Sequence, residues 1–228
     1  VILNLKKAMN WDFTMDSHIE VVDSCNIRGY RFSEGWARGQ KVYFATRFSR
    51  PFKSVEMDEA EIKLKGEKVG TSKIARFMFD TEEGDQITIV TALSGVSVEG
   101  AVKNLDAEAP HNDFDQYLAA AKADWNKHLQ RIEVKGGNAD DRVNFYTALY
   151  HSMIAPTIYS DVDGKYYGPD KQVHQADGWV NYSTFSLWDT FRAAHPLFTY
   201  TEPERVGDMV QSFIAFYEQN GRLPVWNF

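Results

Sequence analysis

The stretch NDFDQYLAAAKADWNKHLQRI, residues 112–132, marks the place where the chain changes from one kind of secondary structure to another. Its apolar residues recur every three or four positions, which places them on one helical face with Lys, Asp and Gln opposite. These residues are Phe114, Leu118, Ala121, Trp125, Leu129 and Ile132. The spacing predicts an amphipathic helix, and we expect its apolar stripe, Trp125 included, to pack into a core.

Residues 1–105, before this helix, are predicted to form β-strands. The segments KVYFATRFS (41–49) and DQITIVTALSG (85–95) are rich in Val, Ile, Thr and aromatic residues, and polar and apolar positions partly alternate in them. Glycine-containing turns are expected at LKGEKVG (64–70) and TEEGDQ (81–86). Short strands at this spacing favour an antiparallel β-sandwich over parallel strands joined by helices.

The residues after the first helix are predicted to form more helices in series. GGNADD (136–141) breaks the first helix and offers Asn138 as the N-cap of a second. This second helix is apolar on more than one side, so we expect it to be buried, and Pro156 is expected to end it. A third helix is expected to carry residues 184–198.

A fourth helix is predicted to begin at TEPE, where Thr201 and Glu204 have the spacing of a capping box and Pro203 lies in the first turn. Gly221 is expected to end it. The order of a β region, a linker helix and helices in series indicates two domains, and we expect the helical domain to be incomplete.

The composition is that of a globular chain with an acidic balance. Of its 228 residues 43% are hydrophobic, and the formal net charge is −7, which argues against nucleic acid or an anionic membrane as partner. The single cysteine, Cys25, excludes an intramolecular disulfide. No run of 18 apolar residues predicts a membrane span, and the opening VILNLKKAMN does not resemble a signal peptide.

A long segment, residues 157–183, shows no periodic pattern and carries four tyrosines and a tryptophan. A loop of this length is usually functional or disordered, and its aromatic content argues against disorder. The rings could stack on a sugar or could cover the end of a helical domain. Within it DVDG (161–164) resembles the start of a calcium loop, but Lys165 stands where the next oxygen ligand belongs, so a turn between short strands is expected.

The stretch TFSLWDTFRAAHPLF, residues 184–198, holds the strongest candidate site. On one interpretation Asp189 and Arg192 form an ion pair at i, i+3 on a helix surface. On the other, Asp189 begins a helix in a cleft, where its carboxylate accepts hydrogen bonds from a polyol and Trp188 and Phe185 form the walls. The crowding of Trp, Asp and Arg within five residues favours the cleft.

Four stretches together resemble glycoside hydrolase family 92: residues 29–52, 144–168, 182–199 and 220–228. The similarity follows nearly the whole chain in order and spacing, and no single short pattern carries it. Members of this family are calcium-dependent, exo-acting α-mannosidases. The family fold is an N-terminal β-sandwich, a helical linker and a C-terminal (α/α)6 barrel.

The resemblance implies a division into a partial β-sandwich at 1–108, a helical linker at 109–136 and the start of the (α/α)6 catalytic domain at 137–228. It also implies that the catalytic acid and base lie beyond this chain, so that no catalytic residue is expected here. The location implied is the periplasm, cell surface or exterior of a bacterium. The partners implied are mannose-containing glycans and the remainder of the same polypeptide.

The family reaction inverts configuration, with an acid and a base whose carboxyl groups stand about 6.5–9.5 Å apart. The implied cofactor is Ca²⁺, which contacts sugar hydroxyls; its ligands in this sequence are unknown. By resemblance and chemistry Asp189 is expected to bind sugar hydroxyls, with Trp188 and Arg192 shaping the pocket. Trp226 and the aromatic segment 159–182 are expected at the rim of the cleft.

Two other interpretations stay open at the level of sequence. The chain could be a non-catalytic carbohydrate-binding or structural fragment, since the acid and base are not expected within it. It could also belong to another (α/α)6 glycosidase, of the glucoamylase or phosphorylase kind, in which Trp-Asp motifs also bind sugar. Phosphate dependence or a preference for glucosides would separate this last possibility from an α-mannosidase.

Overall fold

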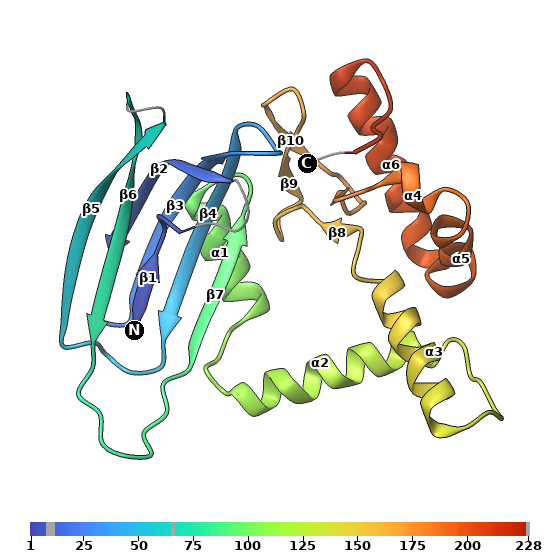
Figure 1. Cartoon of the computed structure of the whole chain (residues 1–228), viewed down its shortest axis with the longest axis horizontal. Coiled ribbons are helices and arrows are strands. Elements are labelled where there is room, and N and C mark those ends of the chain that lie inside the picture. The colour runs from blue at the N-terminus through green and yellow to red at the C-terminus, as the bar shows by residue number, and fades with distance from the viewer. Residues whose placement is uncertain (8–11, 65–66, 227–228) are drawn as a thin grey trace. The chain divides into compact units, whose positions relative to one another are not determined.

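The computed structural model describes residues 1–7, 12–64 and 67–226 (Figure 1). The chain divides into two compact units. Residues 1–112 and 161–163 form the first, which we call the sheet unit, and residues 113–160 and 164–228 form the second, the helical unit. None of the described helices is long and apolar enough to cross a membrane.

The sheet unit consists of two antiparallel sheets. One has the order β1-β6-β5, with β1 at Ile2–Asn4, β6 at Glu67–Met78 and β5 at Ser54–Leu64. The other has the order β2-β3-β4-β7, with β2 at Phe13–Val21, β3 at Asn26–Glu34, β4 at Gln40–Phe48 and β7 at Ile89–Ser94. This confirms the predicted antiparallel sandwich. The turn at 81–86 is confirmed by Gly84, whereas the one expected at 64–70 falls partly on 65–66, outside the described residues.

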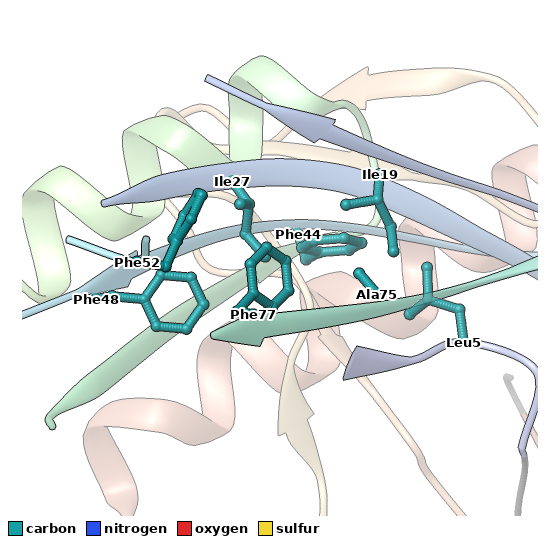
Figure 2. Packing of buried hydrophobic residues seen from close by; sticks show 8 residues of the cluster. All are labelled: Leu5, Ile19, Ile27, Phe44, Phe48, Phe52, Ala75 and Phe77. Carbon is teal, nitrogen blue, oxygen red and sulfur yellow. The ribbon is translucent and has the colours of Figure 1, made fainter. Parts of the chain in front are cut away.

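The core lies between the two sheets (Figure 2). Along β4 the side chains alternate, so that Phe44 and Phe48 face the core while Ala45 faces away. The buried members of this core are Leu5, Ile19, Ile27, Phe44, Phe48, Phe52, Ala75 and Phe77. Phe77 is 1% exposed, and its ring centroid lies 5.1–5.3 Å from those of Phe52 and Phe48. The aromatic residues in the strands therefore supply much of the burial that holds this unit together.

A helix, α1 at Val98–Glu108, covers the outer face of β4 and β7. The sequence predicted β structure up to residue 105, which includes most of this helix. The prediction was wrong for residues 98–105. Ser97 caps the helix, since its hydroxyl accepts a hydrogen bond from Gly100 N at 2.9 Å. Ala101 and Leu105 pack against the alanines of the sheet, and such small side chains let a helix approach closely.

The segment Asp161–Asp163 belongs to the sheet unit although it lies far along the chain. The Asp161 carboxylate accepts hydrogen bonds from Ser94 Oγ at 2.7 Å and from Asn104 Nδ2 at 2.9 Å. Asn104 Oδ1 in turn accepts one from Val162 N at 2.8 Å. Asp161 is 6% exposed, and burial raises its pKa above the usual range. These contacts confirm a turn here, between β8 (Thr157–Ile158) and β9 (Lys165–Tyr167).

The helical unit contains α2 (Phe114–Leu129), α3 (Ala139–Ser152), α4 (Leu187–Thr190), α5 (Ala194–Thr201) and α6 (Pro203–Asn220) (Figure 1). The predicted caps are confirmed at two ends. Asn138 and Asp141 form a reciprocal capping box at the start of α3. Gly221 ends α6 with a φ of 76°, a conformation that glycine adopts without steric cost.

Two predictions about burial were wrong. No residue of α2 is buried: Phe114 is 64% exposed and Trp125 is 36% exposed. In α3 only Leu149 is buried, and Val143 is open to solvent. The physical reason is that periodicity reports which side of a helix is apolar and not what covers that side.

The segment 157–183 is more regular than predicted. β8 pairs with β11 (Tyr182–Ser183), and β9 pairs with β10 (Val173–Gln175), in two small antiparallel sheets. Tyr166 and Tyr182 are both 4% exposed. The Tyr166 hydroxyl accepts a hydrogen bond from Gln219 Nε2 in α6 at 2.8 Å. These two aromatic residues therefore anchor the segment within the helical unit.

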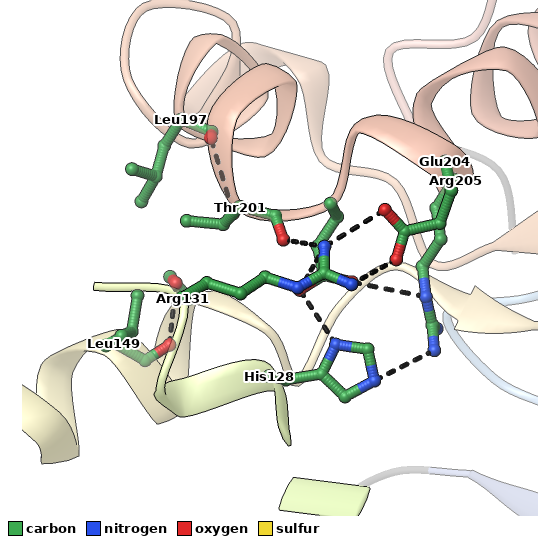
Figure 3. A network of polar contacts seen from close by, with 9 residues as sticks. His128, Arg131, Leu149, Leu197, Thr201, Glu204 and Arg205 are labelled. Atoms are coloured by element: carbon green, nitrogen blue, oxygen red, sulfur yellow. Dashed lines mark hydrogen bonds and ion pairs between the residues drawn. The ribbon is translucent and has the colours of Figure 1, made fainter. Parts of the chain in front are cut away.

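The start of α6 differs from the predicted capping box. Pro203 occupies the first turn as expected, but no side chain caps the helix. Thr201 Oγ1 donates instead to Leu197 O at 3.3 Å, and Glu204 pairs with Arg131, which follows α2. Figure 3 shows this arrangement. Glu204, which the local pattern assigned to the capping box, thus pairs with Arg131, a residue distant in the sequence.

Candidate functional site

The stretch 184–198 forms two short helices and not the single helix predicted. α4 ends at Thr190, and α5 begins at Ala194 with Pro196 in its first turn, where a missing N–H is tolerated. Thr184, just before α4, has a φ of 59°, an uncommon conformation for a β-branched residue. It is held there by Thr157, whose backbone N donates to Thr184 Oγ1 at 3.0 Å.

Asp189 is fixed by a short chain of hydrogen bonds. Ser186 Oγ donates to Asp189 Oδ2 at 2.5 Å, and Trp226 Nε1 donates to Ser186 Oγ at 2.8 Å. The backbone supports this contact, because Leu187 N donates to Val225 O at 3.1 Å and Ser186 and Trp226 form a β-bridge. The structure thus brings together Asp189 and Trp226, which are 37 positions apart in the sequence.

Ser186 was missed by the sequence analysis. A serine directly before a helix is a familiar N-cap signal, but here its side chain makes no capping bond to the backbone. Its hydroxyl instead donates a hydrogen bond to Asp189 and accepts one from Trp226. The N-cap pattern could have drawn attention to this serine, whereas its second partner is visible only in the fold.

The ion pair between Asp189 and Arg192, the less favoured of the two interpretations, is not formed among the described residues. The Arg192 guanidinium carbon lies 5.1 Å from the centroid of the Phe191 ring, in cation–π range. Asp189 and Arg192 are both exposed. The carboxylate is therefore available to a ligand and is not neutralised by the nearest arginine.

Three aromatic residues open to solvent lie near Asp189 in the sequence or are linked to it through Ser186. Trp188 is 71% exposed, Phe191 is 56% exposed and Trp226 is 45% exposed. Phe185, predicted as a wall, is instead 1% exposed and packs against Phe213 at 4.4 Å between ring centroids. Phe185 belongs to a buried cluster with Tyr182, Phe198 and Met209, whereas Trp188 is open to solvent.

His195 lies behind the site in an aromatic environment. Its ring centroid is 5.6 Å from that of Phe198 and 6.1 Å from those of Phe185 and Phe213. Burial lowers the pKa of His195, and the Thr190 backbone opposes this only in part. His195 is partly buried among these rings, and no proton transfer is assigned to it.

Metal-binding side chains are not gathered at this site. In the part of the chain that the structure describes, no three His, Cys, Asp or Glu side chains come together as a metal-binding group. The described residues therefore do not fit a protein-held calcium ion bound through such side chains. What the site offers is one oriented carboxylate, an arginine and several ring faces.

Two family profiles match the chain. The one described as the glycosyl hydrolase family 92 N-terminal domain matches residues 1–94, and the one described as the family 92 catalytic domain matches residues 100–228. No curated protein matches the sequence.

Solved structures similar to this chain come from the same family. The family GH92 α-mannosidase BT3965 from Bacteroides thetaiotaomicron gives a TM-score of 0.90 at 29% identity, over 100% of this chain and 32% of its own. The same enzyme in complex with mannoimidazole gives 0.90 at 29%, over 100% and 31%. The family GH92 inverting mannosidase BT2199 from that organism gives 0.84 at 28%, over 99% and 30%. The chain thus spans about a third of the length of these relatives.

Proposed function

Because this chain belongs to glycosyl hydrolase family 92, we propose that it serves in the hydrolysis of terminal, non-reducing α-linked mannose from N-glycans or mannan. The observation that carries the proposal is the exposed Asp189 carboxylate, held by Ser186 beside the exposed rings of Trp188 and Trp226. The mannoimidazole complex of the similar α-mannosidase supports a mannose-type ligand. The helices of this unit are proposed to begin an (α/α)6 barrel.

The roles of the residues follow from their chemistry. Asp189, acceptor-only when ionised, accepts hydrogen bonds from two sugar hydroxyls, and such charge-assisted bonds are about twice as strong as neutral ones. The ring faces of Trp188 and Trp226 meet the C–H face of the pyranose, and Arg192 donates to a hydroxyl oxygen. Because Ser186 already holds Asp189, binding costs little reorganisation of the carboxylate.

The proposal includes inversion of configuration, which the inverting mannosidase among the similar structures supports. An inverting reaction needs one carboxylic acid that protonates the leaving oxygen and one carboxylate that activates water. We assign neither group to a residue of this chain and propose that both lie outside it. Asp189 therefore binds the sugar and takes no part in proton transfer.

Calcium dependence is proposed on the ground of the family alone. A bound calcium ion would supply a hard, oxygen-seeking charge for sugar hydroxyls. Since the described residues offer no group of three such ligands, no ligand and no step is assigned to the ion. The proposed location is the periplasm, surface or exterior of a bacterium, which the Bacteroides relatives support.

The test is the release of mannose from α-1,2-linked mannobiose by the protein that carries this chain, followed by NMR of the first anomer formed. The proposal expects free mannose that appears first as the β-anomer. Release of the α-anomer would contradict inversion. Glucose release from a glucoside, or release that needs phosphate, would favour another (α/α)6 glycosidase, and sugar binding without any release would favour a non-catalytic carbohydrate-binding fragment.

A further inference from the structure

A buried carboxylate lies at the junction of α5 and α6, away from the Asp189 cluster. Glu202 is 5% exposed, and its Oε1 lies 3.0 Å from His128 Nδ1. Its Oε2 lies 3.2 Å from Arg205 Nε. Figure 3 shows the His128 ring beside Arg205, whose terminal nitrogen lies 3.4 Å from His128 Nε2.

These contacts fix the hydrogen-bonding state of His128. Arg205 can only donate, so His128 Nε2 accepts, and Nδ1 of the neutral ring then donates to Glu202. Donors and acceptors thus alternate from Arg205 through His128 to Glu202. The three side chains are oriented before any ligand arrives.

A cavity of about 240 Å³ lies against these three groups. Trp125, Phe198 and Asp124 also line it. The stripe of α2, expected to be core, therefore places Trp125 at a cavity. Neither Asp189 nor any of its neighbours Ser186, Trp188 and Trp226 lines this space, so it is separate from the site described above.

The wall combines apolar rings with a few polar groups that are already oriented, as in small-molecule sites. Its buried carboxylate is paired, because Glu202 Oε2 lies 3.2 Å from Arg205 Nε, and the second carboxylate of the lining, Asp124, is exposed to solvent. A paired buried charge favours a neutral ligand over an ion. Indole and phenyl faces suit the C–H face of a pyranose, while Glu202 and Arg205 offer an acceptor and donors to its hydroxyls. The volume is below that of sites for drug-sized ligands and suits one ring.

We propose that this cavity binds a single neutral hexopyranose, as a second sugar site distinct from the one at Asp189. The choice of mannose as the first probe rests on the proposed function, whereas the argument that the cavity binds a sugar rests on its lining residues alone. Glucose is therefore the second probe, because both sugars present a C–H face and ring hydroxyls.

The experiment follows the ¹⁹F NMR resonance of Trp125 in protein labelled with 5-fluorotryptophan, assigned by Trp125→Phe, while mannose or glucose is added. We expect a saturable shift of the Trp125 resonance with at least one sugar. Sorbitol, which has hydroxyls but no ring, should produce no such shift. Equal shifts with sorbitol, or no saturable shift with either sugar, would overturn the second site.

Glu202→Gln is expected to weaken the Trp125 response about tenfold or more, since a charged acceptor in the cavity is lost. Glu204→Gln is the matched control, because Glu204 belongs to the same network but does not line the cavity, and its response should match the wild type. If Glu202→Gln fails to fold, Ala155→Leu replaces it: the larger side chain at the cavity wall should abolish the response. An unchanged response in whichever variant folds would overturn the proposal.

The same spectra keep the two sites apart. Resonances of Trp188 and Trp226 report the site at Asp189, so a shift of these two alone would refute the second site and leave the proposed function standing. A shift of Trp125 alone would support the second site and count against mannose binding at Asp189.

Discussion

At the scale of single residues, Asp189 shows how a fold makes a carboxylate useful. Its charge is not cancelled by Arg192, and one of its oxygens is held by Ser186, which is itself held by Trp226. A side chain fixed in this way points in one direction without losing its affinity for hydroxyl groups. This arrangement supports the proposed role of Asp189 in binding a ligand.

Replacing Asp189 by Asn tests its proposed role directly. Because a charged acceptor in contact with the sugar is lost, kcat/KM for mannose release is expected to fall about 100-fold or more. Asp177→Asn, at another exposed aspartate of the same unit, is the control and should leave kcat/KM unchanged. A loss below about threefold in Asp189→Asn, at unchanged stability, would mean that Asp189 is only structural.

Gly100 is a second residue whose role can be tested alone. A Cβ at this position would lie 2.2 Å from Asp161 Oδ2 and 2.7 Å from Ser94 Oγ, within a buried network. Gly100→Ala is therefore expected to lower the free energy of unfolding of the sheet unit by about 1–3 kcal/mol, as overpacking does.

Gly207→Ala is the matched control for this substitution. Gly207 also lies in a helix, α6, but a Cβ there meets no atom within 4 Å. We expect Gly207→Ala to be neutral or to stabilise by about 0.5–1 kcal/mol, in line with helix propensity. Denaturant unfolding of both variants measures the contrast, and equal effects would show that the contact with Asp161 does not matter.

At the scale of elements, the start of α6 is joined to the end of α2 by charge. Arg131 donates to both carboxylate oxygens of Glu204 and to the Thr201 carbonyl (Figure 3). The hydrogen bond from Arg131 lowers the pKa of Glu204 to about 2. Since Glu204 is more than half exposed, solvent screening keeps the pair to no more than about 1 kcal/mol.

The sign of the pH effect follows from the lowered pKa. The Glu204 carboxyl stays ionised in the folded chain at pH values where the same group is already protonated in the unfolded chain. Its contribution to the free energy of unfolding is therefore complete above pH 4.5 and declines as the pH falls toward 2. The stability difference between wild type and Glu204→Gln should therefore be constant from pH 7 to 5 and shrink at pH 4 and pH 3. Thermal unfolding of both proteins measures it, and a difference that stays constant down to pH 3 would contradict the assignment.

At the scale of the whole molecule, the chain joins a sandwich with a buried aromatic core to a helical unit with large exposed apolar side chains. In the helical unit Tyr200 is 83% exposed and Trp188 is 71% exposed, while in the sheet unit the phenylalanines between the sheets are buried. The sheet unit therefore has a buried aromatic core of its own. The binding chemistry that we propose lies on the helical side.

Metal removal tests the proposed activity at this scale. We expect EDTA to abolish mannose release from α-1,2-linked mannobiose and added calcium to restore it, with magnesium as the control that fails to do so. Release that is insensitive to EDTA would remove calcium from the proposal and leave the sugar-binding roles untouched. The response to EDTA is independent of the effect of Asp189→Asn, because no metal is assigned to Asp189.

The sequence by itself determined the succession of a sandwich and helices, the caps at Asn138 and Gly221, and the family. It also determined a strand, predicted at 41–49 and observed at Gln40–Phe48. Each of these depends on local conformation or on a pattern along the chain: alternation in strands, capping at helix ends, and motif order across nearly all residues. They could be predicted because neighbouring residues carry the information. The crowding of Trp188, Asp189 and Arg192 drew attention to Asp189, and the family resemblance added to it.

Only the tertiary structure decided which groups meet. It brought Ser186 into contact with both Asp189 and Trp226, and it paired Glu204 with Arg131 in place of the predicted cap. It also buried Phe185 and left Trp125 beside a cavity. The physical reason is that burial and pairing depend on partners tens of residues away. A local pattern shows that a side chain is apolar or charged, but the packing of distant segments decides what covers it or pairs with it.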